Sequence, residues 1–231
     1  MTVLARIRLS LVLAVLASAS ACDDDAPVAP TSPTTPASNG AATSPAVPGG
    51  PEATQPVPDT PKFVSRIEEP ENPKIGDVVL VREFHDNSVL ATERTELCAP
   101  DGKRIRQGPM KAWHSNGELQ IEGGYDEQGR LTGHWRYYDE QGEIQREGDY
   151  EAGLRAGDWT EYWPGGQMKS QGLLHVGLCE GPWKYWYENG QPMAEGSYVN
   201  NRREGPWLFW EPDGKPDLKQ TGEYKEHVRV K

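Results

Sequence analysis

Residues 181–198 read GPWKYWYENGQPMAEGSY, and this stretch decides the fold. An aromatic, strand-like run precedes Asn189 and Gly190, and a second strand-like run follows them and closes on Gly196 and Tyr198. Asparagine followed by glycine accepts positive φ at both central positions of a turn, so this pair indicates a two-residue hairpin turn. The stretch is therefore predicted to form one antiparallel β-hairpin.

The same pattern occurs five times between residues 108 and 231. Each unit has glycine at its first and tenth positions, an aromatic residue at its sixth, and a closing glycine two residues before tyrosine or leucine. The third position is tryptophan in every unit except the first, where it is Met110. All eight tryptophans and all nine tyrosines of the chain lie in this array, which predicts a repeat architecture. The units start at Gly108, Gly133, Gly157, Gly181 and Gly205.

Each unit is predicted to consist of a strand, a tight turn, a second strand and a connecting loop. Within residues 133–138, Trp135 and Tyr137 should share one face of a strand, while Arg136 and Tyr138 share the other. The closing glycine should let an aromatic side chain of a neighbouring strand pack over its missing Cβ. We therefore predict an all-β fold, an elongated antiparallel β-meander of stacked hairpin repeats.

Residues 62–107 are predicted to form an N-terminal β cap. Residues 77–85 and 89–98 have the composition of two strands, and Asp101-Gly102 indicates a hairpin turn before residues 104–106. A repeat array needs a terminal unit that covers its first exposed core face, and this segment is placed to supply one.

The first 22 residues predict export. Two arginines precede an apolar core and a run of small residues, and no acidic residue occurs among them, as in a secretory signal too short to span a membrane. Residues 19–22, Ala-Ser-Ala-Cys, resemble a bacterial lipobox, which makes Cys22 the predicted lipidation site. The alternative is an ordinary signal cleaved after Ala21. A lipid anchor would place the folded part outside the cytoplasm, on either the inner or the outer membrane.

Residues 23–61 contain ten prolines and no aromatic residue, which predicts a disordered linker between the membrane and the folded part. Without Arg6 and Arg8 the chain has 22 Lys and Arg against 35 Asp and Glu, a net charge of −13. This balance argues against nucleic acid as a partner, because nucleic acid calls for a basic surface. Cys98 and Cys179 lie about 30 Å apart in a linear stack of strands, so no disulfide between them is expected.

The pattern G-x-W-x-x-[YW]-x-x-x-G, followed by E-G-x-Y, resembles the MORN-repeat variant. The resemblance covers residues 108–231, over half of the chain, in five copies. The variant occurs in bacterial secreted proteins and lipoproteins and in proteins labelled antitoxin-like, so it implies architecture more specifically than function. This sequence departs from the pattern at Met110 and Ala112 in the first unit, at Glu161 and Leu174 in the third, and in a two-residue insertion in the fifth.

No catalytic group of residues is apparent. The five histidines do not recur at one repeat position, and the chain has no Gly-x-Ser-x-Gly, P-loop or dinucleotide fingerprint. Glu122, Glu147 and Glu195 recur before the closing glycine, which packing or solvation of the repeat explains better than acid–base catalysis. No closely spaced Cys/His cluster suggests zinc. We predict a non-enzyme, monomeric, with no cofactor or metal.

Aromatic residues are the candidate binding residues, because surplus tryptophan and tyrosine on a surface suits protein hot spots or sugar stacking. The competing interpretation is that they form cross-strand ladders that stabilise a single-layer sheet. The first hypothesis is a membrane-anchored scaffold lipoprotein that binds another envelope or secreted protein; a second version binds cell-wall glycan. The alternative class is an antitoxin- or immunity-like protein that neutralises a toxin. The nine candidates are Tyr137, Tyr138, Tyr162, Trp163, Tyr185, Trp186, Tyr187, Phe209 and Trp210.

Overall fold

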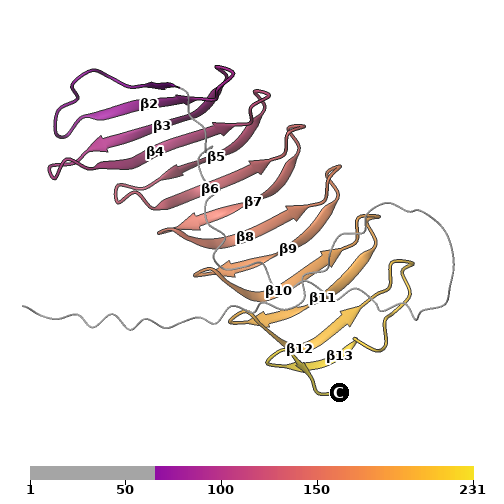
Figure 1. The fold of residues 1–231 in the computed structure, drawn as a ribbon. Coiled ribbons are helices and arrows are strands. Elements are labelled where there is room, and N and C mark those ends of the chain that lie inside the picture. The colour runs from indigo at the N-terminus through magenta and orange to yellow at the C-terminus, as the bar shows by residue number, and fades with distance from the viewer. Residues whose placement is uncertain (1–65) are drawn as a thin grey trace, which may run out of the picture.

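The computed structural model describes residues 66–231, which form one open antiparallel sheet of 14 strands in chain order (Figure 1). The predicted all-β meander of hairpins is confirmed. The signal segment, Cys22 and the linker at 23–61 lie outside the described residues. The strands are β1 (Arg66–Glu68), β2 (Val78–Phe84), β3 (Leu90–Cys98), β4 (Arg104–Trp113), β5 (Leu119–Tyr125), β6 (Leu131–Tyr138), β7 (Ile144–Glu151), β8 (Leu154–Tyr162), β9 (Met168–His175), β10 (Leu178–Trp186), β11 (Pro192–Val199), β12 (Arg202–Phe209), β13 (Gly222–Lys225) and β14 (Val228–Arg229).

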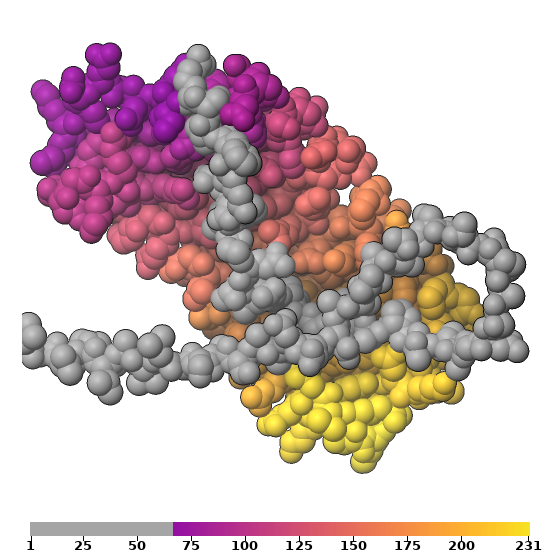
Figure 2. Space-filling model, viewed as in Figure 1, coloured from indigo at the N-terminus to yellow at the C-terminus, as the bar shows by residue number. Residues whose placement is uncertain are grey.

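The described residues make an elongated body that runs from the indigo N-terminal strands to the yellow C-terminal ones (Figure 2). Turns within the units line one long edge of the sheet, and turns between units line the other (Figure 1). Among residues 66–231, no helix is long and apolar enough to cross a membrane. In the same range, no group of three or more His, Cys, Asp or Glu side chains is placed to hold a metal ion.

The two-residue turn predicted at Asn189-Gly190 is wrong. The strands end at Trp186 and resume at Pro192, and Gly190 N–H donates to the Tyr187 carbonyl at 2.9 Å. Only Gly190 of the pair has positive φ, at 81°. This is the longer hairpin loop in which one left-handed glycine follows an ordinary turn. Asn189 instead accepts a hydrogen bond from Gln191 N–H, 3.0 Å, and donates to the Pro212 carbonyl of the next unit, 2.9 Å.

Two-residue turns occur between the units. Ala152-Gly153, Val176-Gly177 and Asn200-Asn201 have positive φ at both positions, and each separates two consecutive strands. Their second residue also donates its N–H back to the preceding unit, as Gly177 does to the Arg155 carbonyl at 2.8 Å. These turns therefore reverse the chain and also hold neighbouring units together.

The glycine that starts each unit lies inside a strand. Gly181, with φ of 66°, sits where the register between β9 and β10 shifts, between Glu180 and Trp183. A bulge of this kind adds twist and bends the strand. Residues 104–106 accordingly belong to the same strand as the start of the first unit, β4, and are not a separate element.

One face of the sheet, called the core face here, carries the buried aromatic residues. Trp135, Trp159, Trp183 and Trp207 are almost fully buried, and each indole lies over the closing glycine of the preceding unit, where a Cβ would overlap the ring. The prediction for the closing glycine is thus confirmed in these four cases. Some rings meet edge to face, as Tyr198 and Trp207 do with centroids 5.0 Å apart, and others stack, as Trp183 and Tyr185 do with centroids 6.0 Å apart. Both are favoured aromatic geometries.

The third unit interrupts this aromatic ladder. Leu174 replaces the closing tyrosine, and Glu161 replaces the tyrosine or phenylalanine that fills the fifth position in units two, four and five. Leu174 is buried, and Arg155 fills the neighbouring space with its guanidinium carbon 4.5 Å from the centre of the Trp159 ring. Cys179 is also buried here as a free thiol, and burial raises its pKa to about 12.

At the N-terminal end, the core face combines a small apolar cluster of Val79, Val81 and Cys98 with buried charged residues. Arg94 forms ion pairs with Glu83 at 2.8 Å and Glu96 at 2.7 Å, and it donates to the hydroxyl of Thr92. The hydrogen bond from Arg94 is the main reason that the pKa of Glu83 is lowered. Strands β1 to β3 thereby extend the sheet beyond the first unit and replace aromatic packing with a satisfied network of charges.

Candidate binding surface

The structure separates the nine candidate aromatic residues into three groups. Tyr137, Tyr185 and Phe209 lie on the core face with exposed fractions of 3%, 4% and 2%, so the prediction that they are surface residues is wrong. Alternation along the strand, together with the curvature that closes neighbouring rings over one another, explains their burial. The hydroxyls of Tyr137 and Tyr185 bond those of Tyr150 and Tyr198. The other six candidates are partly exposed.

Trp163 and Tyr187, at the seventh position of their units, hold adjacent units together. Trp163 Nε1 donates to the Trp186 carbonyl at 2.9 Å, and Tyr187 Oη donates to the Trp210 carbonyl at 2.7 Å. His114 makes the same bond to the Tyr138 carbonyl at 3.1 Å. We call these contacts the position-seven bonds. Their polar atoms are engaged within the sheet and are not presented to a partner.

The last four candidates occupy the sixth position, on the face opposite the core, called the polar face here. Tyr138 Oη donates to Glu122 at 2.8 Å, and Tyr162 Oη donates to Glu147 at 3.0 Å, so each tyrosine bonds the preceding unit. Because two strands separate equivalent positions, neighbouring residues of this row are about 10 Å apart. The position-six row consists of Trp113, Tyr138, Tyr162, Trp186 and Trp210.

The polar face of units one and two is held by ion pairs. Arg136 bridges Glu147 at 3.1 Å and Glu122 at 3.5 Å, and His134 contacts Glu147 and Asp149. The hydrogen bond from Tyr138 and the pairing with Arg136 lower the pKa of Glu122. Burial raises the pKa of Glu147, but the hydrogen bonds from Arg136, His134 and Tyr162 outweigh burial and lower this pKa overall. This part of the face satisfies its own charges.

Units four and five differ from units two and three because they have tryptophan, as unit one does, in place of tyrosine at the sixth position. Trp186 and Trp210 have no hydroxyl to bond Gln171 and Glu195, and no hydrogen bond within residues 66–231 uses either indole N–H. Leu173 and Leu208 on the same face are 40% and 42% exposed. Half-buried indoles beside exposed leucines are the composition of protein interface cores. The candidate binding surface is therefore the Trp186–Trp210 end of the position-six row.

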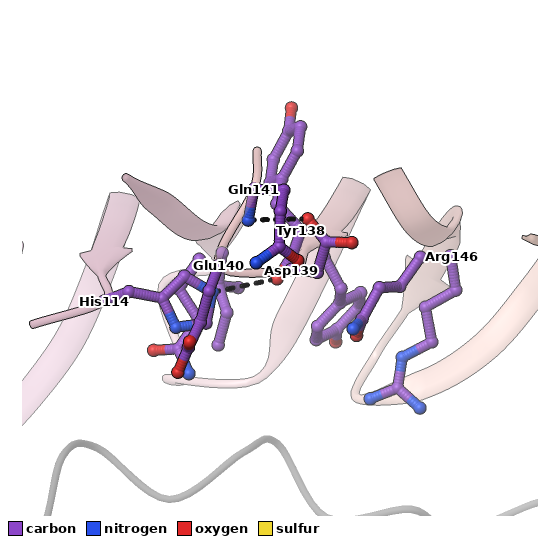
Figure 3. A pocket seen from close by; sticks show the side chains of 10 residues that line it. His114, Tyr138, Asp139, Glu140, Gln141 and Arg146 are labelled. Atoms are coloured by element: carbon purple, nitrogen blue, oxygen red, sulfur yellow. Dashed lines mark hydrogen bonds between the residues drawn. The ribbon is translucent and has the colours of Figure 1, made fainter. Parts of the chain in front are cut away.

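A separate hollow lies between the within-unit turns of units one and two (Figure 3). It has a volume of about 480 Å³. Figure 3 shows His114 and Arg146 on opposite sides, with the turn residues Asp139, Glu140 and Gln141 between them. The guanidinium carbon of Arg146 stands 4.2 Å from the centre of the Tyr137 ring. The lining consists of His114, Gln120, Ile121, Tyr137, Tyr138, Asp139, Glu140, Gln141, Gln145 and Arg146.

The repeat alignment places Trp113 at the sixth position, but the nine candidate binding residues do not include it, and the hollow is not among the features predicted from the sequence. The signal for including Trp113 was present, because it stands at the same repeat position as Tyr138, which is a candidate. The sequence gives a weaker indication of the hollow. Asp139 and Gln145 stand at repeat positions where units three and four have larger or apolar side chains. Whether such a pair leaves space depends on how far its neighbours reach, which the sequence does not state.

Comparison with solved structures and curated proteins adds little. Two matching structures are of TarM, one of them a mutant from S. aureus in complex with fondaparinux, alpha-GlcNAc-glycerol and UDP. Each match has 14% identity, covers 60% of this chain and 22% of the TarM chain, and has a TM-score of 0.21, which supports no argument. No curated protein matches this chain significantly.

Comparison with protein families gives a specific result. Four segments match the family model described as MORN repeat variant: residues 106–127, 131–152, 155–174 and 180–200. They correspond to the first four units of the sheet, and the matches end before the irregular fifth unit. Such repeats suggest a repeat-based binding or scaffold role. The first four hairpin units of this chain are thus similar to the MORN repeat variant.

Proposed function

We propose that this chain is a membrane-anchored, non-enzymatic scaffold lipoprotein of the bacterial cell envelope that binds another protein through its polar face. The contact surface is the Trp186–Trp210 end of the position-six row. The observation that carries the proposal is the change from tyrosine bonded to glutamate in units two and three to tryptophan with an unused N–H in units four and five. Lipidated Cys22 anchors the chain to the membrane, and residues 23–61 link this anchor to the folded part.

Charges on the polar face support this location. Around Arg136 the ion pairs are satisfied, so a partner would have to break them in order to bind there. Lys184 and Glu195 face each other across β10 and β11, and neither takes part in an ion pair within residues 66–231. A protein partner can pair these two groups at the rim while the indoles form the buried centre.

Site-specific photocrosslinking in living cells tests the surface. A photoreactive residue at Lys184 should capture a defined protein, while one at Lys111, the equivalent position in unit one, should capture much less. The double substitution Trp186→Ala and Trp210→Ala should abolish the product at Lys184 by removing the apolar centre, with thermal unfolding confirming the fold. Equal capture at both positions, or capture unaffected by the double substitution, would refute the proposal.

Membrane fractionation tests the anchor separately. The Cys22→Ser variant should leave the membrane fraction and appear as a soluble extracytoplasmic protein, because acyl chains on this cysteine hold the chain at the bilayer. A Ser20→Ala variant, which keeps the cysteine, serves as the control. If Cys22→Ser stays with the membrane as the wild type does, the anchoring is wrong even where the crosslinking succeeds.

A further inference from the structure

The hollow between the turns of units one and two is a feature that the proposed protein interface does not use. It is placed at the turn edge of the sheet, whereas the interface involves the strands of units four and five (Figure 1, Figure 3). Its volume of about 480 Å³ falls in the range of about 300–1,000 Å³ that is usual for small-molecule sites. The hollow is therefore large enough to hold a ligand.

Two repeat positions explain why the hollow is open in this place. The seventh position holds Trp163 in unit three and Tyr187 in unit four, and both reach the following unit. In unit two it holds Asp139, whose carboxylate turns back and accepts the N–H groups of Gln141 and Glu143. The large side chain that would lie over this part of the sheet is thus missing.

The other of these two repeat positions is the thirteenth, three residues before the closing glycine. In unit four it is Met193, which is buried in the core cluster, and in unit three it is Lys169, whose ammonium lies 5.2 Å from the Trp163 ring centre. In units one and two it is Gln120 and Gln145, and both line the hollow. In unit four, Tyr187 and Met193 fill the space next to the turn. In unit two, Asp139 and Gln145 leave the equivalent space open.

The lining has the chemistry of a site for an uncharged, hydroxyl-rich ligand. In the described part of the chain, no hydrogen bond occupies the side-chain amides of Gln120, Gln141 and Gln145 or the carboxylate of Glu140. Each amide offers both a donor and an acceptor, which is what a hydroxyl group needs. Glu140 and Asp139 stand with Arg146 in one hollow, so a ligand of either charge would meet a like charge as well as an opposite one.

We propose that this hollow binds one or two neutral sugar residues of a glycan. The amides and Glu140 hold the hydroxyl groups. Arg146, braced over Tyr137 by the cation–π contact, forms one wall, and His114, fixed by its bond to the Tyr138 carbonyl, forms the other. The inference is independent of the proposed protein interface, because the residues that line the hollow include none from the Trp186–Trp210 end of the position-six row. Tyr138 belongs to that row but lies in unit two, and its ring points away from Arg146 (Figure 3).

The chain supplies its own substitutions for the test. Replacing Asp139→Tyr and Gln145→Met together copies the closed arrangement of unit four, so the hollow should fill without loss of the fold. Asp139→Asn is the control, because it keeps the side-chain size and the acceptor for the turn. Circular dichroism and thermal unfolding establish that each full-length variant is folded.

Saturation-transfer NMR with N,N′-diacetylchitobiose, cellotriose and maltotriose measures binding. We expect the wild type and Asp139→Asn to bind at least one of these sugars, and the double variant to bind about tenfold more weakly or not at all. Trp186→Ala with Trp210→Ala should bind the sugar as the wild type does, which separates this site from the protein interface. Absence of binding by the wild type, or unchanged binding by the filled variant, overturns the proposal. Loss of the protein crosslink at Lys184 in the filled variant would also overturn it, since the hollow would then belong to the protein partner.

Discussion

The indole of Trp183 lies directly over Gly172, and a Cβ at that glycine would overlap the ring. The two residues belong to neighbouring units, and their backbones are paired across β9 and β10. The indoles of Trp135, Trp159 and Trp207 lie in the same way over Gly123, Gly148 and Gly196. Each unit therefore provides the empty space into which the next unit places its tryptophan, and this contact links the stack from one unit to the next.

Gly172→Ala should lower the free energy of unfolding by about 3 kcal/mol, because the fully packed indole has no room to move away. Gly124→Ala, at another strand glycine without positive φ and without an indole over it, should cost much less. Chemical denaturation measures both. In a Trp183→Ala background the Gly172 substitution should become nearly neutral, and additive effects of the two changes would contradict the contact.

Val176→Asn should stabilise the protein by about 1 kcal/mol, since Val176 has φ of 50°, where a β-branched side chain is strained. The equivalent turn of the next unit already uses Asn200. Thermal unfolding measures the change. Val199→Asn, an exposed strand position at the start of that turn, is the control and should give no gain. A gain at both positions would point to solubility and not to turn geometry.

The carboxylates of the polar face should make stability fall in acid. The pKa values of Glu122 and Glu147 lie below their ordinary value of 4.5, so their contribution is complete above that pH and is lost as the pH falls through the lowered values. Since both groups are partly exposed, the pair should contribute at most about 1 kcal/mol. Urea unfolding of wild type and of Glu122→Gln with Glu147→Gln should therefore differ at about pH 6, and the difference should shrink as the pH falls below the ordinary value. Glu188→Gln, in an exposed loop, should follow the wild type over the same pH range, and a constant gap would exclude the ion pairs as the cause.

Removal of residues 229–231 should loosen the last unit alone. Gly222 has no following tryptophan; the backbone of Lys231 and the side chain of Arg229 lie over it, and Arg229 donates to the Thr221 carbonyl at 2.9 Å. Hydrogen exchange should accelerate in β12 and β13 and stay unchanged in β6 to β9, because each unit contacts only its neighbours. Arg229→Lys should show a partial effect. Uniform acceleration along the chain would mean that the sheet unfolds as a whole.

The sequence by itself determined the repeat, the direction of the strands and the role of the closing glycines. These features follow from local rules, since a period of 24 residues with glycine at fixed positions leaves few ways to stack hairpins, and alternation assigns Trp135 and Tyr137 to one face. The local rules also misled at Asn189-Gly190. Turn residues of this kind suit two loop lengths, and the hydrogen bond of Asn189 to the next unit favours the longer one.

The tertiary structure alone decided which aromatic residues are available. Tyr137, Tyr138, Trp163 and Trp186 look alike in the sequence. In the structure Tyr137 lies in the core and Tyr138 is bonded to glutamate. Trp163 bonds the adjacent unit, and Trp186 has an indole N–H that no hydrogen bond uses among the described residues. The physical reason is that availability depends on the neighbouring unit, through the carbonyl, carboxylate or ring that it presents. The hollow at Asp139 has the same origin, because it exists only where two successive turns fail to fill the space between them.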